Sequence, residues 1–156
     1  MLLELLYNVS LLMALTVAYD FIVGVLHRGS SGERVVSGLL FGLFAIVGML
    51  TPMEFAPGVI YDGRSIVLGV AAYVGGPGVG VIGGTVAGIY RVWIGGAGTL
   101  PGILSIVSAV AVGAVGFRLR SRDERWQRPL RIVVLGVVIH VLVLLSQAFL
   151  PHRLYL

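Results

Sequence analysis

The sequence predicts an all-α membrane protein, a polytopic bundle of about six helical segments. Of its 156 residues, 58% are hydrophobic and only 12% are charged, whereas soluble domains carry about 25% charged residues. The mean hydropathy is +1.02. Apolar stretches alternate with short polar or glycine- and proline-containing ones, as in chains that cross a bilayer several times. We therefore expect one transmembrane domain over residues 1–156, with the lipid bilayer as its first partner.

The predicted helical segments, in order, are residues 3–26, 35–50, 65–74, 78–91, 101–117 and 132–150. The first has no basic start and no small-residue cleavage site, which predicts a retained span rather than a signal peptide. Gly38 and Gly42 give the second segment a face of small residues. A stretch with two prolines, residues 51–63, predicts a loop. A basic loop, residues 118–131, is expected between the last two segments.

The region from Arg64 to Arg91 allows two interpretations. As one helix it would rise about 40 Å and place the two arginines at opposite membrane faces. However, Gly75, Gly76 and Pro77 fall near its midpoint, and proline after two glycines breaks helices. The alternative is a hairpin of two helices of about 15 and 21 Å, which must be sheltered by protein because they are shorter than the bilayer. We favour the hairpin, which brings Arg64 and Arg91 to the same side.

Glycines recur at every fourth position along the second arm of this hairpin, at Gly76, Gly80, Gly84 and Gly88. Such a stripe lets helix backbones touch inside a bilayer, and packing is its commoner use. Arg91 lies seven residues after Gly84 and therefore shares the stripe. A guanidinium aimed into a membrane bundle is a candidate functional group.

The hairpin would assemble a candidate anion site. Asp62 suits the N-cap position of the helix that starts near Arg64, and Arg91 closes the next helix. Gly95 and Gly96 then lead to Thr99-Leu100-Pro101, a plausible cap followed by a first-turn proline. Two guanidiniums and the positive end of a helix dipole favour an anion, and arginine grips a carboxylate bidentately.

Ser105, one turn inside the fifth segment, would add a hydroxyl to this site. The predicted ligand-binding residues are thus Arg64, Arg91 and Ser105. Ser105 also begins a small-residue row with Ala109 and Gly113, which we expect to pack on the glycine stripe. Plainer interpretations stay open. The two arginines could be interfacial anchors or could pair with acidic residues in the preceding loop, and the Ser105 hydroxyl could bond to the backbone of its own helix.

The sequence also argues against several functions. It contains no cysteine, which rules out disulfides and thiolate metal sites. It lacks the phosphate-binding, zinc-protease, kinase and cyclase motifs, so we expect no catalytic residue, no metal and no cofactor.

All 11 basic residues are arginines, and most lie in one short loop between apolar segments, so nucleic acid is not an expected partner.

Arginine counts predict the orientation. Residues 118–131 carry six arginines against two acids, and the loop after the first segment carries Arg28 and Arg34. The positive-inside rule places both loops in the cytoplasm. Both chain ends, and the loops with Arg64 and Arg91, then face outward.

From Asp62-Gly63-Arg64 to Gly113 the sequence resembles the LytS/YhcK-type five-transmembrane receptor domain of bacterial signalling proteins. The matching features are the Asp-x-Arg opening, Gly-Gly-Pro at 75–77, the glycine-spaced helix, Tyr90-Arg91 and Gly95-Gly96. The resemblance is good over about residues 35–120 and rests on hydropathy elsewhere. The short-helix and glycine-helix pattern also resembles the substrate-binding S-components of energy-coupling-factor vitamin transporters.

The resemblance implies a sensory input module in the bacterial inner membrane, ahead of a LytS-type histidine kinase or a diguanylate cyclase. Such domains are often dimeric and are linked to cell-wall control or to sensing carboxylates such as pyruvate. Arg64 and Arg91 would then grip the ligand, with Ser105 as a third contact. The chain stops after the sixth segment, which suggests a truncated piece or a stand-alone sensor. A transporter subunit and a purely structural dimerisation bundle remain the rivals, and the helices may be counted as five or six.

Overall fold

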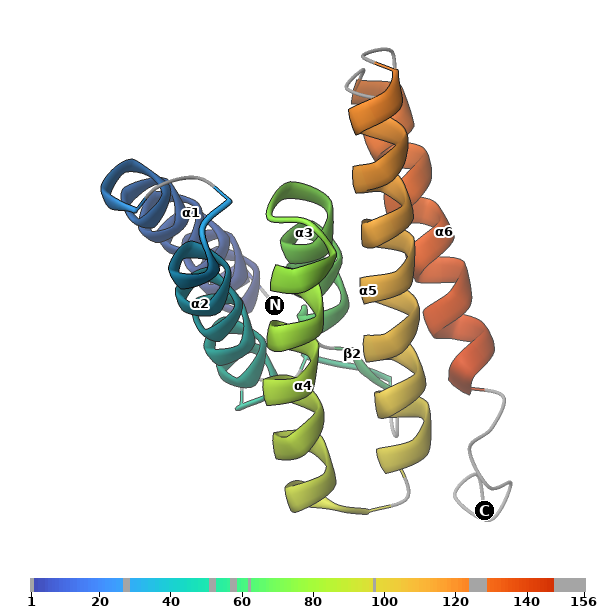
Figure 1. Cartoon of the computed structure of the whole chain (residues 1–156). Coiled ribbons are helices and arrows are strands. Elements are labelled where there is room, and N and C mark those ends of the chain that lie inside the picture. Colours follow the sequence, from blue (N-terminus) through green and yellow to red (C-terminus); the bar gives the residue numbers. More distant parts are fainter. Residues whose placement is uncertain are drawn as a thin grey trace.

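The computed structural model describes residues 2–26, 29–50, 53–56, 59–61, 63–96, 98–123 and 129–147. Within these residues six helices form a bundle, with α1 and α2 on one side, α3 and α4 in the middle and α5 and α6 on the other side (Figure 1). The helices are α1 (Leu2–Val25), α2 (Ser31–Leu50), α3 (Arg64–Val74), α4 (Pro77–Ile94), α5 (Thr99–Arg122) and α6 (Pro129–Gln147). The predicted all-α bundle of six segments is confirmed.

The hairpin between α3 and α4 is confirmed as well. Gly76 has a φ of 89°, a left-handed conformation that reverses the chain, and Pro77 starts α4 at a position where no amide donor is needed. At 11 residues, α3 is about 16 Å long and is too short to cross a bilayer. It is enclosed instead, since it contacts α2, α4, α5 and α6. Residues such as Leu68 and Ala72 are fully buried there.

Replacing Gly76 by alanine is expected to lower the free energy of unfolding by about 1–2 kcal/mol, because a left-handed backbone is costly for any residue with a Cβ. A Cβ on Gly76 would also lie 3.3 Å from the Phe117 ring. The matched control is Gly78→Ala, whose Cβ would meet Arg34 at an ordinary 3.5 Å. Unfolding in mixed SDS micelles, followed by circular dichroism, measures both. Equal stability of the two variants would contradict the role assigned to Gly76.

Small residues bring α4 very close to two neighbours. On the α2 side, a Cβ on Gly83 would lie 3.1 Å from the carbonyl oxygen of Gly38, and one on Gly42 would lie 2.7 Å from Val86. On the α5 side, Cβ atoms on Gly84 and Gly88 would meet Val110, Ile106 and Ile103 at 3.1–3.7 Å. The glycine stripe is therefore a packing surface, as the commoner interpretation held.

The small-residue row of α5 was expected to pack on the stripe of α4, and this expectation is wrong for two of its members. A Cβ on Gly113 would collide with the Gly69 carbonyl oxygen and with Ala72, both on α3, and the Ala109 carbonyl also faces Gly69. Branched side chains of α5 fill the stripe instead. The row permits the close approach of α5 to α3, a helix that is too short to cross the bilayer and is enclosed by other helices.

Several boundaries differ from the predicted ones, and α4, for example, runs to Ile94 instead of ending at residue 91. In the predicted loop 51–63, β1 (Met53–Ala56) pairs antiparallel with β2 (Val59–Tyr61). The second helix starts earlier than expected, because Ser30 caps it: the amide of Glu33 donates to Ser30 Oγ over 3.1 Å. The fifth helix runs to Arg122, so the start of the expected basic loop is helical, in keeping with the good helix propensity of arginine.

Candidate functional site

The register of α3 and α4 places both predicted arginines at one end of the hairpin. A Cβ on Gly80 would lie 2.5 Å from that of Ala72, and one on Gly83 would lie 3.3 Å from Leu68. In an antiparallel pair of this register, Arg64 lies opposite Ala87, about one helical turn before Arg91. The backbone thus brings the starts of α3 and α5 and the end of α4 to the same end of the bundle.

Arg91 lies across the first turn of α5. A Cβ on Gly102 would lie 2.6 Å from Arg91 Nε and 3.1 Å from its Cδ and Cγ, and a Cβ on Gly98 would lie 2.7 Å from Nη2. Both glycines leave room for the guanidinium in this position. Gly98 is the N-cap of α5, so the charge rests on the positive end of that helix. The field of α5 therefore favours an anion beside Arg91, whereas the C-terminal end of α4, where Arg91 also lies, favours the guanidinium itself.

The hydrogen bonds of Arg91 leave part of its donor capacity unused. Nη1 donates to the carbonyl oxygen of Gly95 over 3.2 Å. Nε is buried and, among the residues that the structure describes, has no acceptor. A buried donor without an acceptor is costly, so such a group points to a missing partner. An acceptor such as a carboxylate oxygen would satisfy it.

The other two predicted ligand-binding residues, Arg64 and Ser105, lie on α3 and α5. Arg64 is the first residue of α3, is half-buried and takes part in at least one interaction within the protein. Ser105 is buried, and its hydroxyl donates to the carbonyl oxygen of Gly102 over 2.7 Å, as the plainer interpretation held. That bond consumes its only proton, so toward a ligand Ser105 has acceptor capacity alone.

Two predicted helix caps are wrong. Gly63, and not Asp62, occupies the N-cap of α3, and Asp62 itself lies outside the described residues. Thr99 is the first residue of α5 rather than its cap, and its hydroxyl donates to the carbonyl oxygen of Gly96 over 2.8 Å. Gly95 and Gly96 have φ values of 70° and 87°, so this linker does require glycine.

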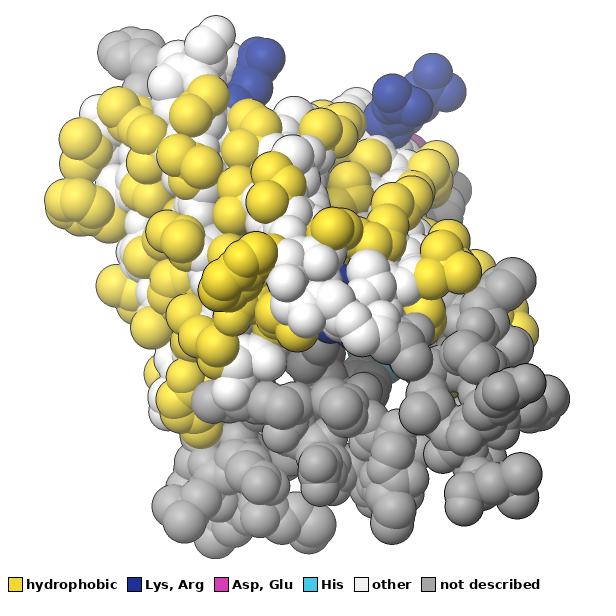
Figure 2. Space-filling model, turned by 90° about the horizontal axis from the view of Figure 1, so that it is seen from below, with side chains coloured by type: hydrophobic (Ala, Val, Ile, Leu, Met, Phe, Trp, Pro, Cys, Tyr) yellow, Lys and Arg dark blue, Asp and Glu magenta, His cyan; other side chains and the backbone are white. Residues whose placement is uncertain are grey.

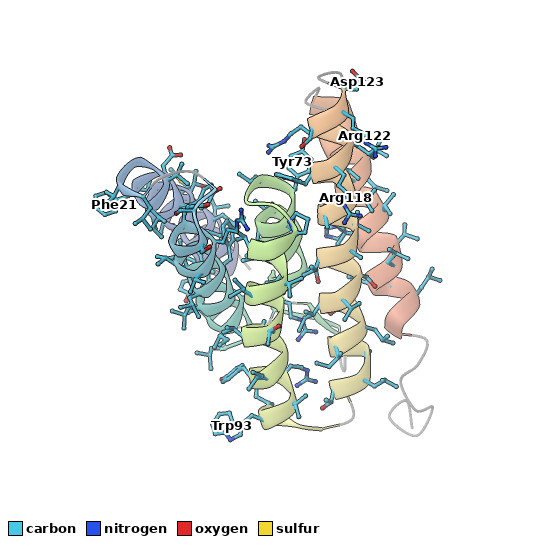
Figure 3. The ribbon with its side chains drawn as sticks, in the orientation of Figure 1. Phe21, Tyr73, Trp93, Arg118, Arg122 and Asp123 are labelled. Carbon is cyan, nitrogen blue, oxygen red and sulfur yellow. The ribbon has the colours of Figure 1, made fainter. Side chains whose placement is uncertain are left out.

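Aromatic residues mark the outer surface near Arg91. Trp93 is 78% exposed, points away from the bundle (Figure 3), and lies 5.8 Å from Tyr90 between ring centroids. Hydrophobic side chains cover much of the described part of this face (Figure 2). Exposed aromatics of this kind are typical of the bilayer interface. The Arg91 end therefore fits the boundary between lipid and water.

The sequence reasoning missed a cavity at the other end of the hairpin. It has a volume of about 1040 Å³ and lies where the chain reverses at Gly76 and Pro77, with Arg34 and Arg120 in its walls. Both arginines had been assigned to loops that set the orientation. No spacing in the sequence pairs Arg34 with Arg120, because they meet only where α2 and α5 both extend beyond the predicted ends.

Comparison with known families decides the classification. Residues 11–155 match the family model described as the 5TMR of 5TMR-LYT. The chain belongs to this family of five-transmembrane receptor domains. The resemblance drawn from Gly-Gly-Pro and the glycine-spaced helix is thereby confirmed, and the protein is a membrane receptor domain of the LytS type.

The sensor histidine kinase/phosphatase LytS of Staphylococcus aureus strains Mu50, N315 and MW2 is 28% identical over 132 residues. The match covers 73% of this chain but only 22% of each relative. The chain thus spans about a fifth of the length of these curated relatives. No solved structure matches it.

By length and composition, two helices within the described residues are able to cross a membrane, Ser31–Leu50 and Thr99–Arg122. The short apolar helix Arg64–Val74 accompanies them. The receptor domain therefore combines longer apolar helices with a short one that depends on its neighbours for cover.

Proposed function

We propose that this LytS-type receptor domain senses a small carboxylate, which binds at the outward-facing end of the bundle between Arg64 and Arg91. The observation that carries the proposal is the buried Nε of Arg91, which has no acceptor among the described residues and lies beside the N-terminal end of α5. A carboxylate would accept from it and would be stabilised by the field of that helix. The relatives' sensor-kinase name supports a signalling role.

Ligand binding would draw α3, α4 and α5 together. Arg91 reaches from the end of α4 onto the first turn of α5, and Arg64 stands at the start of α3. An anion between the two guanidiniums would replace their repulsion by attraction to a shared partner. The shift toward the closed state is limited by the ligand's differential affinity for the two states, with about 1.4 kcal/mol for each factor of ten.

The proposed output lies in a part of the protein beyond this chain, a histidine kinase or a diguanylate cyclase, and no catalytic residue is proposed here. We place the domain in the bacterial inner membrane as a dimer, with the basic stretch 118–131 in the cytoplasm by the positive-inside rule. A transporter subunit is less well supported. The small-residue faces that it would offer to a coupling subunit, Gly38/Gly42 and Ala109/Gly113, are buried against α4 and α3.

Isothermal titration of the purified domain with pyruvate tests this function. We expect saturable binding that Arg91→Ala weakens by at least about tenfold, because a charge-assisted bidentate contact is lost. Arg64→Ala should have a similar effect. Arg118→Ala is the matched control, since this exposed arginine extends from α5 toward the other end of the bundle (Figure 3). Unchanged heats in both pocket variants would defeat the assignment.

A further inference from the structure

The cavity at the α3–α4 turn has the make-up of a second binding site. Its volume of about 1040 Å³ is ample for a polar head group. Gly76 and Pro77 line it from the turn, Arg34 from α2, and Arg120 from α5. It lies at the opposite end of α4 from Arg91, so it is separate from the proposed carboxylate site.

The guanidinium of Arg120 is held in place, and no carboxylate of the described residues pairs with it. Nη2 donates to the carbonyl oxygen of Val74 over 3.4 Å, and the guanidinium carbon lies 5.0 Å from the centroid of the Tyr73 ring and 5.5 Å from that of Phe117. These cation–π contacts fix the side chain along the cavity wall. No other described residue accepts a hydrogen bond from Arg120, so most of its five donors are available to a ligand.

Arg34 faces the same cavity from α2. Its Nη2 donates to the carbonyl oxygen of Gly29 over 2.8 Å. Glu33 also lines the cavity, but its carboxylate is only 4% exposed and accepts from the amide of Gly29 and the hydroxyl of Ser37. It serves the start of α2, where a negative charge is favourable. Within the described residues, then, Arg34 and Arg120 both donate to backbone carbonyls, and two guanidiniums against one carboxylate leave the cavity with an excess of positive charge.

A second, apolar space adjoins the cavity. It has a volume of about 470 Å³ and shares Arg34, Pro77 and Gly78 with the first. The rest of its lining comes from α2 and α4 and includes Val35, Val81 and Ile82. A polar, cationic space thus continues directly into an apolar groove between α2 and α4, where Val35 and Val81 are exposed. This arrangement matches a ligand with an anionic head and a hydrocarbon tail.

We propose that the two adjoining spaces bind an anionic phospholipid, with its phosphate between Arg34 and Arg120 and an acyl chain along the α2–α4 groove. Arginine binds phosphate oxygens bidentately, and basic pockets between transmembrane helices on the cytoplasmic side are typical head-group sites. Arg118 and Arg122 lie on the same stretch of α5, so this end of the bundle carries the excess of arginines (Figure 3). The bound lipid would connect α2 to α5 across the α3–α4 turn.

Native mass spectrometry of protein released from nanodiscs containing equal phosphatidylcholine and phosphatidylglycerol tests the proposal. We expect the wild-type domain to retain phosphatidylglycerol in preference by at least about tenfold. The double variant Arg34→Gln/Arg120→Gln should lose that preference. The control Arg118→Gln/Arg122→Gln removes the same charge from exposed positions of α5 outside the cavity and should retain it.

Other outcomes overturn the proposal. No preference in the wild type, or the same loss in both double variants, would mean general attraction between arginines and anionic lipid. Displacement of phosphatidylglycerol by millimolar inorganic phosphate would mean that the cavity recognises free phosphate. If the glutamine pair fails to fold, Arg34→Lys/Arg120→Lys keeps the charges but loses the bidentate geometry, and an undiminished preference in it would also count against the site.

Discussion

Replacing Gly113 by alanine is expected to destabilise the domain by at least about 2 kcal/mol, the usual scale for overpacking a tight interface. The new methyl group would collide with the backbone carbonyl of Gly69 and come within 2.8 Å of the Ala72 side chain. Neither obstacle is the flexible end of a long side chain, so α3 and α5 would have to move apart. The better helix propensity of alanine, worth about 1 kcal/mol, does not offset this.

The control for this prediction is Gly136→Ala in the middle of α6. A Cβ at Gly136 meets no heavy atom within 4 Å among the described residues, so the variant gains helix propensity without a collision. The same chemical change should therefore have opposite signs at the two positions. Unfolding in mixed SDS micelles, followed by circular dichroism, measures both. Stability of Gly113→Ala at or above the wild-type value would refute the backbone contact between α3 and α5.

The hairpin was predictable because its signal is local. Gly76 and Pro77 favour a chain reversal whatever surrounds them, since one tolerates a left-handed backbone and the other suits the first turn of a helix. Helix ends were less predictable. The polar residues around Glu33 and Arg122 were assigned to loops on hydropathy, although their caps and propensities allow helix. In a membrane protein, loss of hydrophobicity marks the lipid boundary and does not mark the end of the helix.

The site was predictable only in outline. The position of Arg91 on the glycine face followed from helical periodicity, and the structure places that side chain against α5. The need for glycine at Gly98 and Gly102 was not visible, because it depends on which turn of α5 lies beside Arg91. The cavity between Arg34 and Arg120 was missed for the same reason, since residues from α2 and α5 meet only through the packing of α3 and α4 between them.

Replacing Gly102 by alanine is expected to weaken pyruvate binding by at least about tenfold, or 1.4 kcal/mol, while leaving the domain folded. The methyl group would lie 2.6 Å from Arg91 Nε and 3.1 Å from Cδ. Here the obstacle is a long flexible side chain, so the guanidinium moves aside at little cost to stability. What is lost is its position over the first turn of α5, on which the proposed ligand contact depends.

Gly88→Ala provides the matched control for this second substitution. It places the same methyl group on α4 about one turn before Arg91, where the nearest atom, Cδ1 of Ile103, lies at an ordinary 3.7 Å. Its pyruvate affinity should equal that of the wild type. If Gly102→Ala binds normally while Arg91→Ala does not, Arg91 acts from a different side-chain conformation and the placement against Gly102 is irrelevant. If Gly102→Ala and Arg91→Ala both bind pyruvate normally, Arg91 has no part in recognition. The Nε that lacks an acceptor among the described residues would then be a cost of helix packing and not a sign of a ligand site.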